Sequence, residues 1–180
     1  MMDVARHVIN TIIDTEGGYV DDPSDSGGET NHGITKRTAR RYGFDGDLRD
    51  LTRRQAFSMY KDMYWNSVGG DGLAAISPPV AHEVADTAVN IGPTVASKIL
   101  QRSLNILNNR GKLYPDILVD GQIGPKTLNA LVAYVRDREV PVLMKALNCF
   151  QGYYYITLAE RREKDEKFVY GWLNKRVHLM

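Results

Sequence analysis

Apolar residues recur every three to four positions in several separate stretches of the chain, which is the spacing of one face of an α-helix. In the first stretch Val4, Val8 and Ile12 share a face, and the pattern stops at Gly17 and Gly18. A helix over roughly residues 3–15 is therefore predicted. The same spacing predicts further helices over about 35–43, 52–64, 78–91, 93–107, from 125 onward, 142–164 and 168–177.

Residues that start helices reinforce these boundaries. Thr52 and Gln55 stand three apart, as in a capping box, where each side chain bonds the other's backbone N–H. Pro78, Pro93 and Pro125 each open a periodic segment, a position where the missing N–H of proline costs nothing. The chain is therefore expected to fold as a mainly α protein.

Residues 17–34 interrupt the helical pattern. This segment is too rich in Gly, Asp, Ser and Pro for a helix, and it lacks the alternation of a long strand. A small irregular β or loop region is predicted here.

Composition excludes several classes of protein. With 180 residues and 43% hydrophobic content the chain can bury a substantial core, as one domain or as two small ones that share an interface. A net charge of +1 gives no reason to expect nucleic acid as a partner, and no apolar run is long enough for stable membrane insertion. Residues 1–14 lack the features of a signal peptide, so synthesis in the cytoplasm is expected. Cys149, the single cysteine, cannot form an internal disulfide and is predicted to be a buried thiol.

The segment from Glu16 to Thr35 contains the side chains best suited to catalysis. Hydrolysis of a glycosidic bond needs a carboxylic acid that donates a proton and a second group that manages water or charge. Glu16 follows the electronegative end of a helix, where burial would also favour a neutral acid, whereas the glycine-rich loop around Asp25 would keep that carboxylate ionised. Asp25 and Thr30 would hold a water molecule opposite Glu16. This arrangement implies a single displacement with the two carboxyl groups roughly 6.5–9.5 Å apart.

The same residues also have plainer interpretations. Glu16 can be a surface residue at a helix end, and Asp25 can serve only to shape a turn. Asp21 or Asp22 can also be the second carboxylate in place of Asp25.

The motifs of this segment resemble those of a known family. Glu16-Gly-Gly-Tyr19, Asp25-Ser-Gly-Gly-Glu-Thr30 and Gly33-Ile-Thr35 are similar to the signature of glycoside hydrolase family 108, which comprises lysozyme-like N-acetylmuramidases of phages and bacteria. The second half resembles the predicted peptidoglycan-binding domain usually fused behind it. That resemblance rests on Asn90-Ile-Gly-Pro93, Leu100-Gln101, Val119-Asp-Gly-Gln-Ile-Gly-Pro125 and Gly171-Trp-Leu-Asn-Lys-Arg176.

The resemblance implies a lysozyme-like helical fold, with a catalytic domain over residues 1–91 and a helical peptidoglycan-binding-like domain over 92–180. It also implies that Glu16 is the catalytic glutamate and that the β-1,4 bond between N-acetylmuramic acid and N-acetylglucosamine is cleaved. Phage lysozymes of the wider group have five residues between the Asp and the Thr, whereas only four residues separate Asp25 from Thr30. This departure weakens the assignment of a catalytic role to Thr30.

Further residues are candidates for contact with substrate. Tyr19, His32 and Asn90 have the aromatic and amide groups that stack on sugars or bond to them, and Asp86 and Asn90 are placed to line a cleft between the halves. The run from His82 to Asp86 is one residue away from a zinc-protease helix motif, but it lacks a convincing third ligand. No metal and no cofactor are expected.

The sequence thus predicts an endolysin or muramidase whose partner is the glycan strand of peptidoglycan. We expect a monomer that acts on the cell wall after release from the cytoplasm, for which a holin is one route. One alternative is a module that binds peptidoglycan, or assists secretion, without cutting. Another is an amidase or endopeptidase that cuts the peptide stems.

Overall fold

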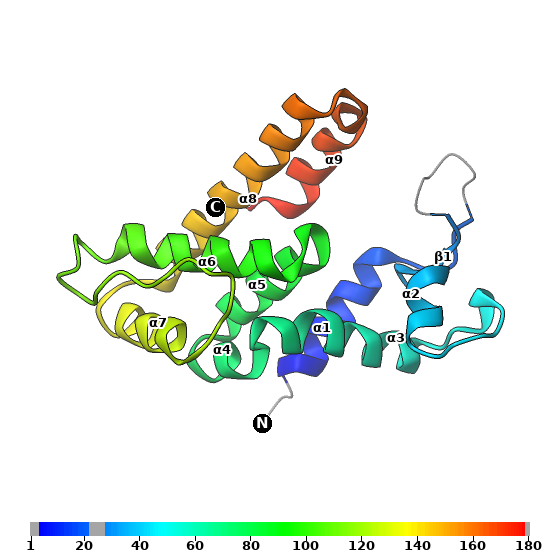
Figure 1. The fold of residues 1–180 in the computed structure, drawn as a ribbon, viewed down its shortest axis with the longest axis horizontal. Helices are drawn as coiled ribbons and strands as arrows, with labels where there is room; N and C mark the ends of the chain where they lie inside the picture. The colour runs from blue at the N-terminus through cyan, green and yellow to red at the C-terminus, as the bar shows by residue number, and fades with distance from the viewer. Residues whose placement is uncertain (1–3, 22–27, 179–180) are drawn as a thin grey trace.

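Helices make up most of the chain in the computed structural model, which describes residues 4–21 and 28–178 (Figure 1). The mainly α, lysozyme-like fold predicted from the sequence is confirmed. The α-helices are α1 (Val4–Glu16), α2 (Lys36–Arg41), α3 (Arg53–Tyr60), α4 (Gly70–Ile76), α5 (Pro78–Ile91), α6 (Pro93–Leu107), α7 (Pro125–Asp137), α8 (Val140–Arg161) and α9 (Glu166–Arg176). Shorter helical turns are η1 (Leu48–Asp50), η2 (Lys61–Trp65), η3 (Asn66–Val68) and η4 (Glu163–Asp165).

Local signals in the sequence set most of the helix starts. The predicted capping box of α3 is present, with the Thr52 hydroxyl accepting from the backbone of Gln55 and the Gln55 side chain accepting from the backbone of Thr52. Proline lies in the first turn of α5, α6, α7 and α8. On α1 the predicted apolar face is buried.

Residues 30–35, at the end of the segment predicted to be a small β or loop region, form a small hairpin. Strands β1 (Thr30–Asn31) and β2 (Ile34–Thr35) pair antiparallel, and Val20 adds an isolated bridge to Thr30. Asn31 is buried, and its side-chain amide donates to the carbonyl of Leu48 at 2.8 Å, which fixes the hairpin on η1. The hairpin therefore has a defined position at the end of α1.

The core joins both halves of the chain. Helices α5 and α6 pack along each other directly across Gly92, and α8 packs against both of them. One cluster of buried side chains includes Ile12 of α1, Leu73 of α4, Val84 of α5, Leu100 of α6 and Leu131 of α7. The proposed domain boundary between residues 91 and 92 thus falls within a continuous hydrophobic core and stays a prediction.

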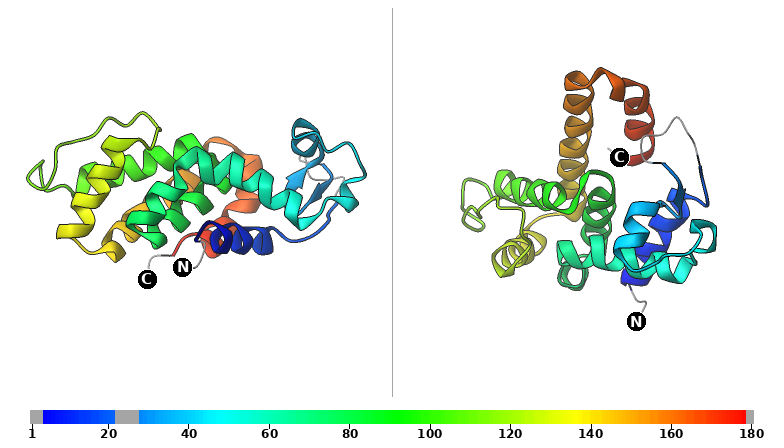
Figure 2. Two further views of the ribbon diagram at one scale, coloured as in Figure 1. Left: turned by 90° about the horizontal axis from the view of Figure 1, so that it is seen from below. Right: turned by 45° about the vertical axis from the view of Figure 1, so that its right-hand side comes forward.

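Helices α8 and α9 lie side by side and extend away from the other helices (Figure 1). The end of α9 returns toward α1, the first helix of the chain (Figure 2). This return brings the last turn of α9 to the helix end that carries Glu16.

Three sequence expectations differ from the structure. Cys149 is exposed, because α8 buries a different face, which includes Asn148 and Gln151. The predicted helix over 142–164 begins at Val140 and ends at Arg161. Residues 70–76 form α4, which was not predicted because its first residues, Gly70, Asp71 and Gly72, favour turns.

Among the described residues, no helix is both long and apolar enough to cross a bilayer.

Candidate active site

Glu16 is the last residue of α1, and the hairpin turn holds the stem of its side chain. Gly33 lies in the left-handed region with φ of 72°, and a Cβ added there would lie 2.8 Å from Cβ of Glu16. Only glycine permits both the backbone conformation and this close approach. The glycine of the hairpin therefore shapes the surroundings of the glutamate.

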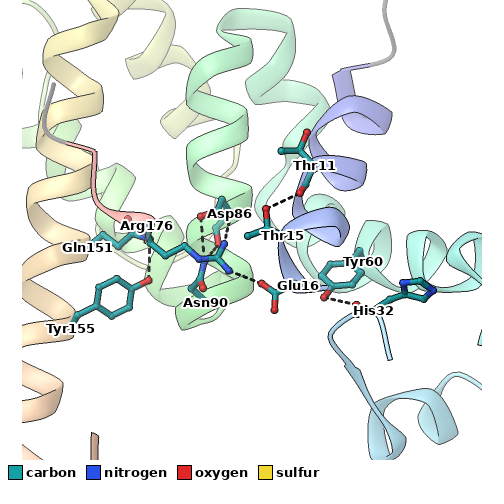
Figure 3. A network of polar contacts seen from close by, with 10 residues as sticks. All are labelled: Thr11, Thr15, Glu16, His32, Tyr60, Asp86, Asn90, Gln151, Tyr155 and Arg176. Atoms are coloured by element: carbon teal, nitrogen blue, oxygen red, sulfur yellow. Dashed lines mark hydrogen bonds and ion pairs between the residues drawn. The ribbon is translucent and has the colours of Figure 1, made fainter. Parts of the chain in front are cut away.

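Neighbouring groups fix the turn that contains Gly33. His32 also has a positive φ, of 52°, and its carbonyl accepts a hydrogen bond from the Tyr60 hydroxyl at 3.1 Å. Burial raises the pKa of Tyr60, and the nearby Glu16 adds to this effect, so the phenol stays a neutral donor. Figure 3 shows the imidazole of His32 directed away from the carboxyl group of Glu16.

Arg176, the last residue of α9, binds the carboxyl group of Glu16. Its Nη2 donates to Oε1 of Glu16 at 2.7 Å, and its Nη1 donates to Oδ1 of Asp86 at 2.8 Å (Figure 3). The side chain of Arg176 is 14% exposed, against 25% for Glu16 and 24% for Asp86. Burial alone would lower the pKa of Arg176, but Asp86 and Glu16 outweigh it and raise that pKa. The guanidinium therefore stays charged between the two carboxylates.

Asp86 and Asn90, which are predicted to line a cleft between the halves, belong to this polar network. The Asn90 amide donates to the backbone carbonyl of Asp86 at 2.7 Å and to its carboxylate at 3.3 Å. Asp86 and Asn90 lie one turn apart on α5, so their side chains share the face that looks toward Arg176 (Figure 3). Glu16, Asp86 and Asn90 thus come together, as two carboxylates and an amide around one cation.

The other predicted site residues lie elsewhere in the structure or outside its described part. Tyr19 donates its hydroxyl to Glu29 at 3.1 Å, and the guanidinium of Arg49 lies 4.7 Å from the centre of its ring. Thr30 is the first residue of β1 and pairs through its backbone with Val20. Asp25 and the alternative Asp22 lie outside the described residues, whereas Asp21 is described and exposed.

A cavity of about 700 Å³ lies beside this network, between α1, α5, α8 and the end of the chain. Its lining includes Arg176 and Asp86, together with Thr15 of α1 and His82 and Glu83 of α5. Burial raises the pKa of Glu83 to about 7, with Asp86 adding to the effect, and burial lowers the pKa of His82. The cavity therefore contains a second acidic group, Glu83, one helical turn before Asp86.

Metal ligation has little support in this part of the molecule. Across residues 4–21 and 28–178, no three side chains of His, Cys, Asp or Glu are grouped as metal ligands would be. Asp86, which the zinc-like motif would have used, instead binds Arg176.

Sequence reasoning missed the role of Arg176. The segment that ends in this residue carried part of the family resemblance, but nothing in its pattern pointed to Glu16, which is 160 residues away. Only the docking of α9 shows this contact.

Chemically, the network combines a partly exposed carboxyl group with a fixed cation, a second carboxylate and an amide donor. Such a set can transfer a proton to a bound substrate and can bind polar groups near it. It has no thiol or hydroxyl group paired with a base, as nucleophilic catalysis would require, among the contacts described above.

Comparisons with known proteins identify two successive domains in this chain. The family described as Glycosyl hydrolase 108 matches residues 9–92, and the family described as Predicted Peptidoglycan domain matches residues 95–177. Among solved structures, "Structure of Brucella abortus SagA" is similar with a TM-score of 0.64 and 27% sequence identity, covering 95% of this chain and 96% of that chain. A comparison with curated proteins gives no significant match. The first half of the chain is therefore a glycosyl hydrolase 108 domain, and a predicted peptidoglycan domain follows it.

Proposed function

We propose that this protein is an N-acetylmuramidase, which hydrolyses the β-1,4 bond between N-acetylmuramic acid and N-acetylglucosamine with Glu16 as the general acid. The two families support a glycoside hydrolase that acts on peptidoglycan. The observation that carries the finer proposal is the position of Glu16. Its carboxyl group is partly exposed where the two halves meet, and the polar side chains of Asp86 and Asn90 lie beside it.

In this proposal Glu16 protonates the leaving oxygen as the glycosidic bond breaks. Asp25 acts as the second carboxylate, and with Thr30 it holds the attacking water for a single displacement. The position of Thr30 supports this assignment only indirectly. Thr30 opens the hairpin whose turn contacts the stem of Glu16.

Substrate contacts are assigned on the same basis. Asn90 is the best supported, because it lies in the network around Arg176 (Figure 3). Tyr19 precedes the hairpin and His32 lies in its turn, and both would contact more distant sugars of the strand. Both stay candidates, since Tyr19 already bonds Glu29 and the carbonyl of His32 already bonds Tyr60.

The cellular setting completes the proposal. The partner is peptidoglycan, and the protein would act as a monomer on the cell wall after release from the cytoplasm. A role in phage lysis, with a holin as the route of release, fits this setting.

The test is the substitution Glu16→Gln, assayed on purified sacculi. General acid catalysis contributes about 10²–10⁴-fold, so release of reducing ends is expected to fall by that factor. Gln has the same shape and can still accept from Arg176, so binding to sacculi and the melting temperature are expected to stay unchanged. Glu160→Gln, at an exposed position on α8, is the matched control and should keep full activity.

Two results would contradict the proposal. If the wild type binds sacculi but releases no reducing ends, the protein is a binding module. If mass spectrometry of the digest shows newly freed amino groups in place of reducing ends, the protein cuts peptide stems.

A further inference from the structure

The contact between Arg176 and Glu16 joins the two halves of the chain at the proposed catalytic carboxyl group. Arg176 belongs to the part matched by the predicted peptidoglycan domain, and Glu16 to the part matched by the glycosyl hydrolase family. Asp86, which holds the other end of the guanidinium, also lies in the hydrolase part. The second half therefore contributes a side chain to the site of the first.

The structure of α9 explains how Arg176 is held in place. No residue of α9 is classed as buried, and the helix packs mainly against α8. Trp172 stacks between Tyr155 of α8 and Phe168, with ring centres 5.3 Å and 5.9 Å apart. Beyond Arg176, the backbone N–H of His178 donates to the side chain of Asn148. The arginine is thus fixed on both sides along the chain.

Glu16 in turn is restrained at both ends of its side chain. Gly33 lies against its Cβ and Cγ, and Arg176 holds Oε1 at 2.7 Å. Glu16 is also the last residue of its helix, where helices tend to fray. Without Arg176, the stem would stay in place but the carboxyl group would be free to turn.

The ion pair between Arg176 and Glu16 also affects the transfer of the proton. A general acid becomes a carboxylate as it donates its proton, so negative charge develops on Glu16 in the transition state. A fixed cation stabilises that charge more than it stabilises the neutral acid, which lowers the barrier. Asp86 keeps the guanidinium oriented, and the low exposure of all three side chains limits screening by water.

We propose that Arg176 is a positioning residue for the reaction. It orients the carboxyl group of Glu16, it stabilises that group as the proton leaves, and it makes the second half of the chain part of the catalytic centre. The proposal rests on the function assigned above to Glu16.

The experiment compares wild type, Arg176→Gln, Arg176→Lys and Lys175→Gln on purified sacculi. Lys175→Gln removes the same charge from the same helix turn, at an exposed position, and is expected to behave like wild type. Arg176→Gln is expected to lower kcat by about 10- to 100-fold, since loss of one such interaction or a small misplacement costs about this much. KM is expected to change less than about threefold, because the interaction grows toward the transition state.

The pH profile separates this role from a merely structural one. Loss of the cation makes the ionised acid less favourable, so the alkaline limb of the kcat profile is expected to move to higher pH in Arg176→Gln. Arg176→Lys keeps the charge but not the two-ended geometry, and is expected to recover part of kcat with a profile close to wild type. Binding to sacculi, compared between Glu16→Gln and the double variant Glu16→Gln/Arg176→Gln, is expected to stay the same.

Several outcomes would overturn the proposal. One is a kcat of Arg176→Gln equal to that of Lys175→Gln. Another is a lower kcat with an unmoved pH profile, which would assign Arg176 to the interface alone. A higher kcat in Arg176→Gln would show that the ion pair slows the reaction.

Two further results decide the remaining cases. If Arg176→Gln does not melt cooperatively, Arg176→Lys decides, and a wild-type kcat in that folded variant refutes the role. If the wild type itself releases no reducing ends, the proposed function fails first and this inference fails with it.

Discussion

Glu83 offers the sharpest test of how burial affects this region. Its carboxyl group lies in the cavity beside Arg176 and accepts a hydrogen bond from the amide of Asn148 at 2.9 Å. Burial, with help from the charge of Asp86, raises its pKa from 4.5 to about 7. We predict that Glu83→Gln makes the protein more stable than wild type at alkaline pH.

The magnitude follows from the two pKa values. Between pH 4.5 and about 7 the folded protein holds a proton on Glu83 that the unfolded chain has released. The free energy of unfolding therefore falls as pH rises through this range and levels off above it. At about 1.36 kcal/mol for each pH unit, the full effect is about 3 kcal/mol, and partial access of solvent reduces it to about 1–3 kcal/mol.

The assay is urea unfolding of wild type and Glu83→Gln at pH 5 and pH 8. At pH 5 the two proteins should be nearly equally stable, because Glu83 is then neutral in the folded state and Gln can accept the same hydrogen bond from Asn148. At pH 8 the variant should be more stable by about 1–3 kcal/mol. Glu160→Gln, at an exposed position, should show no such difference between the two pH values.

Comparison at matched pH is needed because His82 titrates nearby. Burial lowers its pKa, so its contribution to stability increases with pH, opposite in sign to that of Glu83. The difference between wild type and Glu83→Gln removes most of this contribution. An equal stability difference at both pH values, or a variant less stable at pH 8, would refute the reasoning.

Two further predictions concern the hairpin beside Glu16. Gly33→Ala would place Cβ against the Tyr60 hydroxyl and 2.8 Å from Cβ of Glu16. It should therefore cost about 3 kcal/mol in urea unfolding and lower the release of reducing ends. Gly43→Ala is the control, because Gly43 has a similar φ of 77° but open space around it. This variant should lose only about 1–2 kcal/mol of stability and keep its activity. Equal effects of the two substitutions would contradict the steric argument. Asn31→Ala leaves the carbonyl of Leu48 without its donor, so it should cost about 1–3 kcal/mol by thermal unfolding, and a neutral result would show that the buried amide does not hold the hairpin.

Helix positions were largely predictable, because they depend on neighbours in sequence. The spacing of Val8 and Ile12, the capping box at Thr52 and the proline of α6 are local features, and each marked its helix correctly. The predictions were wrong where tertiary packing determines which face of a helix is buried. Cys149 has apolar neighbours in sequence, but α8 buries residues on a different face and leaves the thiol exposed.

The candidate site was predictable only in part. The motif predicts Glu16 as the catalytic acid, which stays a prediction, and Asn90 and Asp86 lie beside each other on α5. Gly33 was read as part of the motif, but its approach to the stem of Glu16 depends on how the hairpin folds back on α1. Catalytic roles of Asp25 and Thr30 stay predictions, and Asp25 lies outside the described residues.

The sequence by itself determined the helices, the interruption after α1 and the placement of a carboxyl group at the end of that helix, since all three follow from the order of residues within a few turns. Only the tertiary structure decided that Arg176 would bind Glu16. The partners lie 160 residues apart, and they meet because α9 packs against α8 and returns to α1. Side-chain spacing describes one helix at a time, whereas the charge next to Glu16 depends on how separate helices dock.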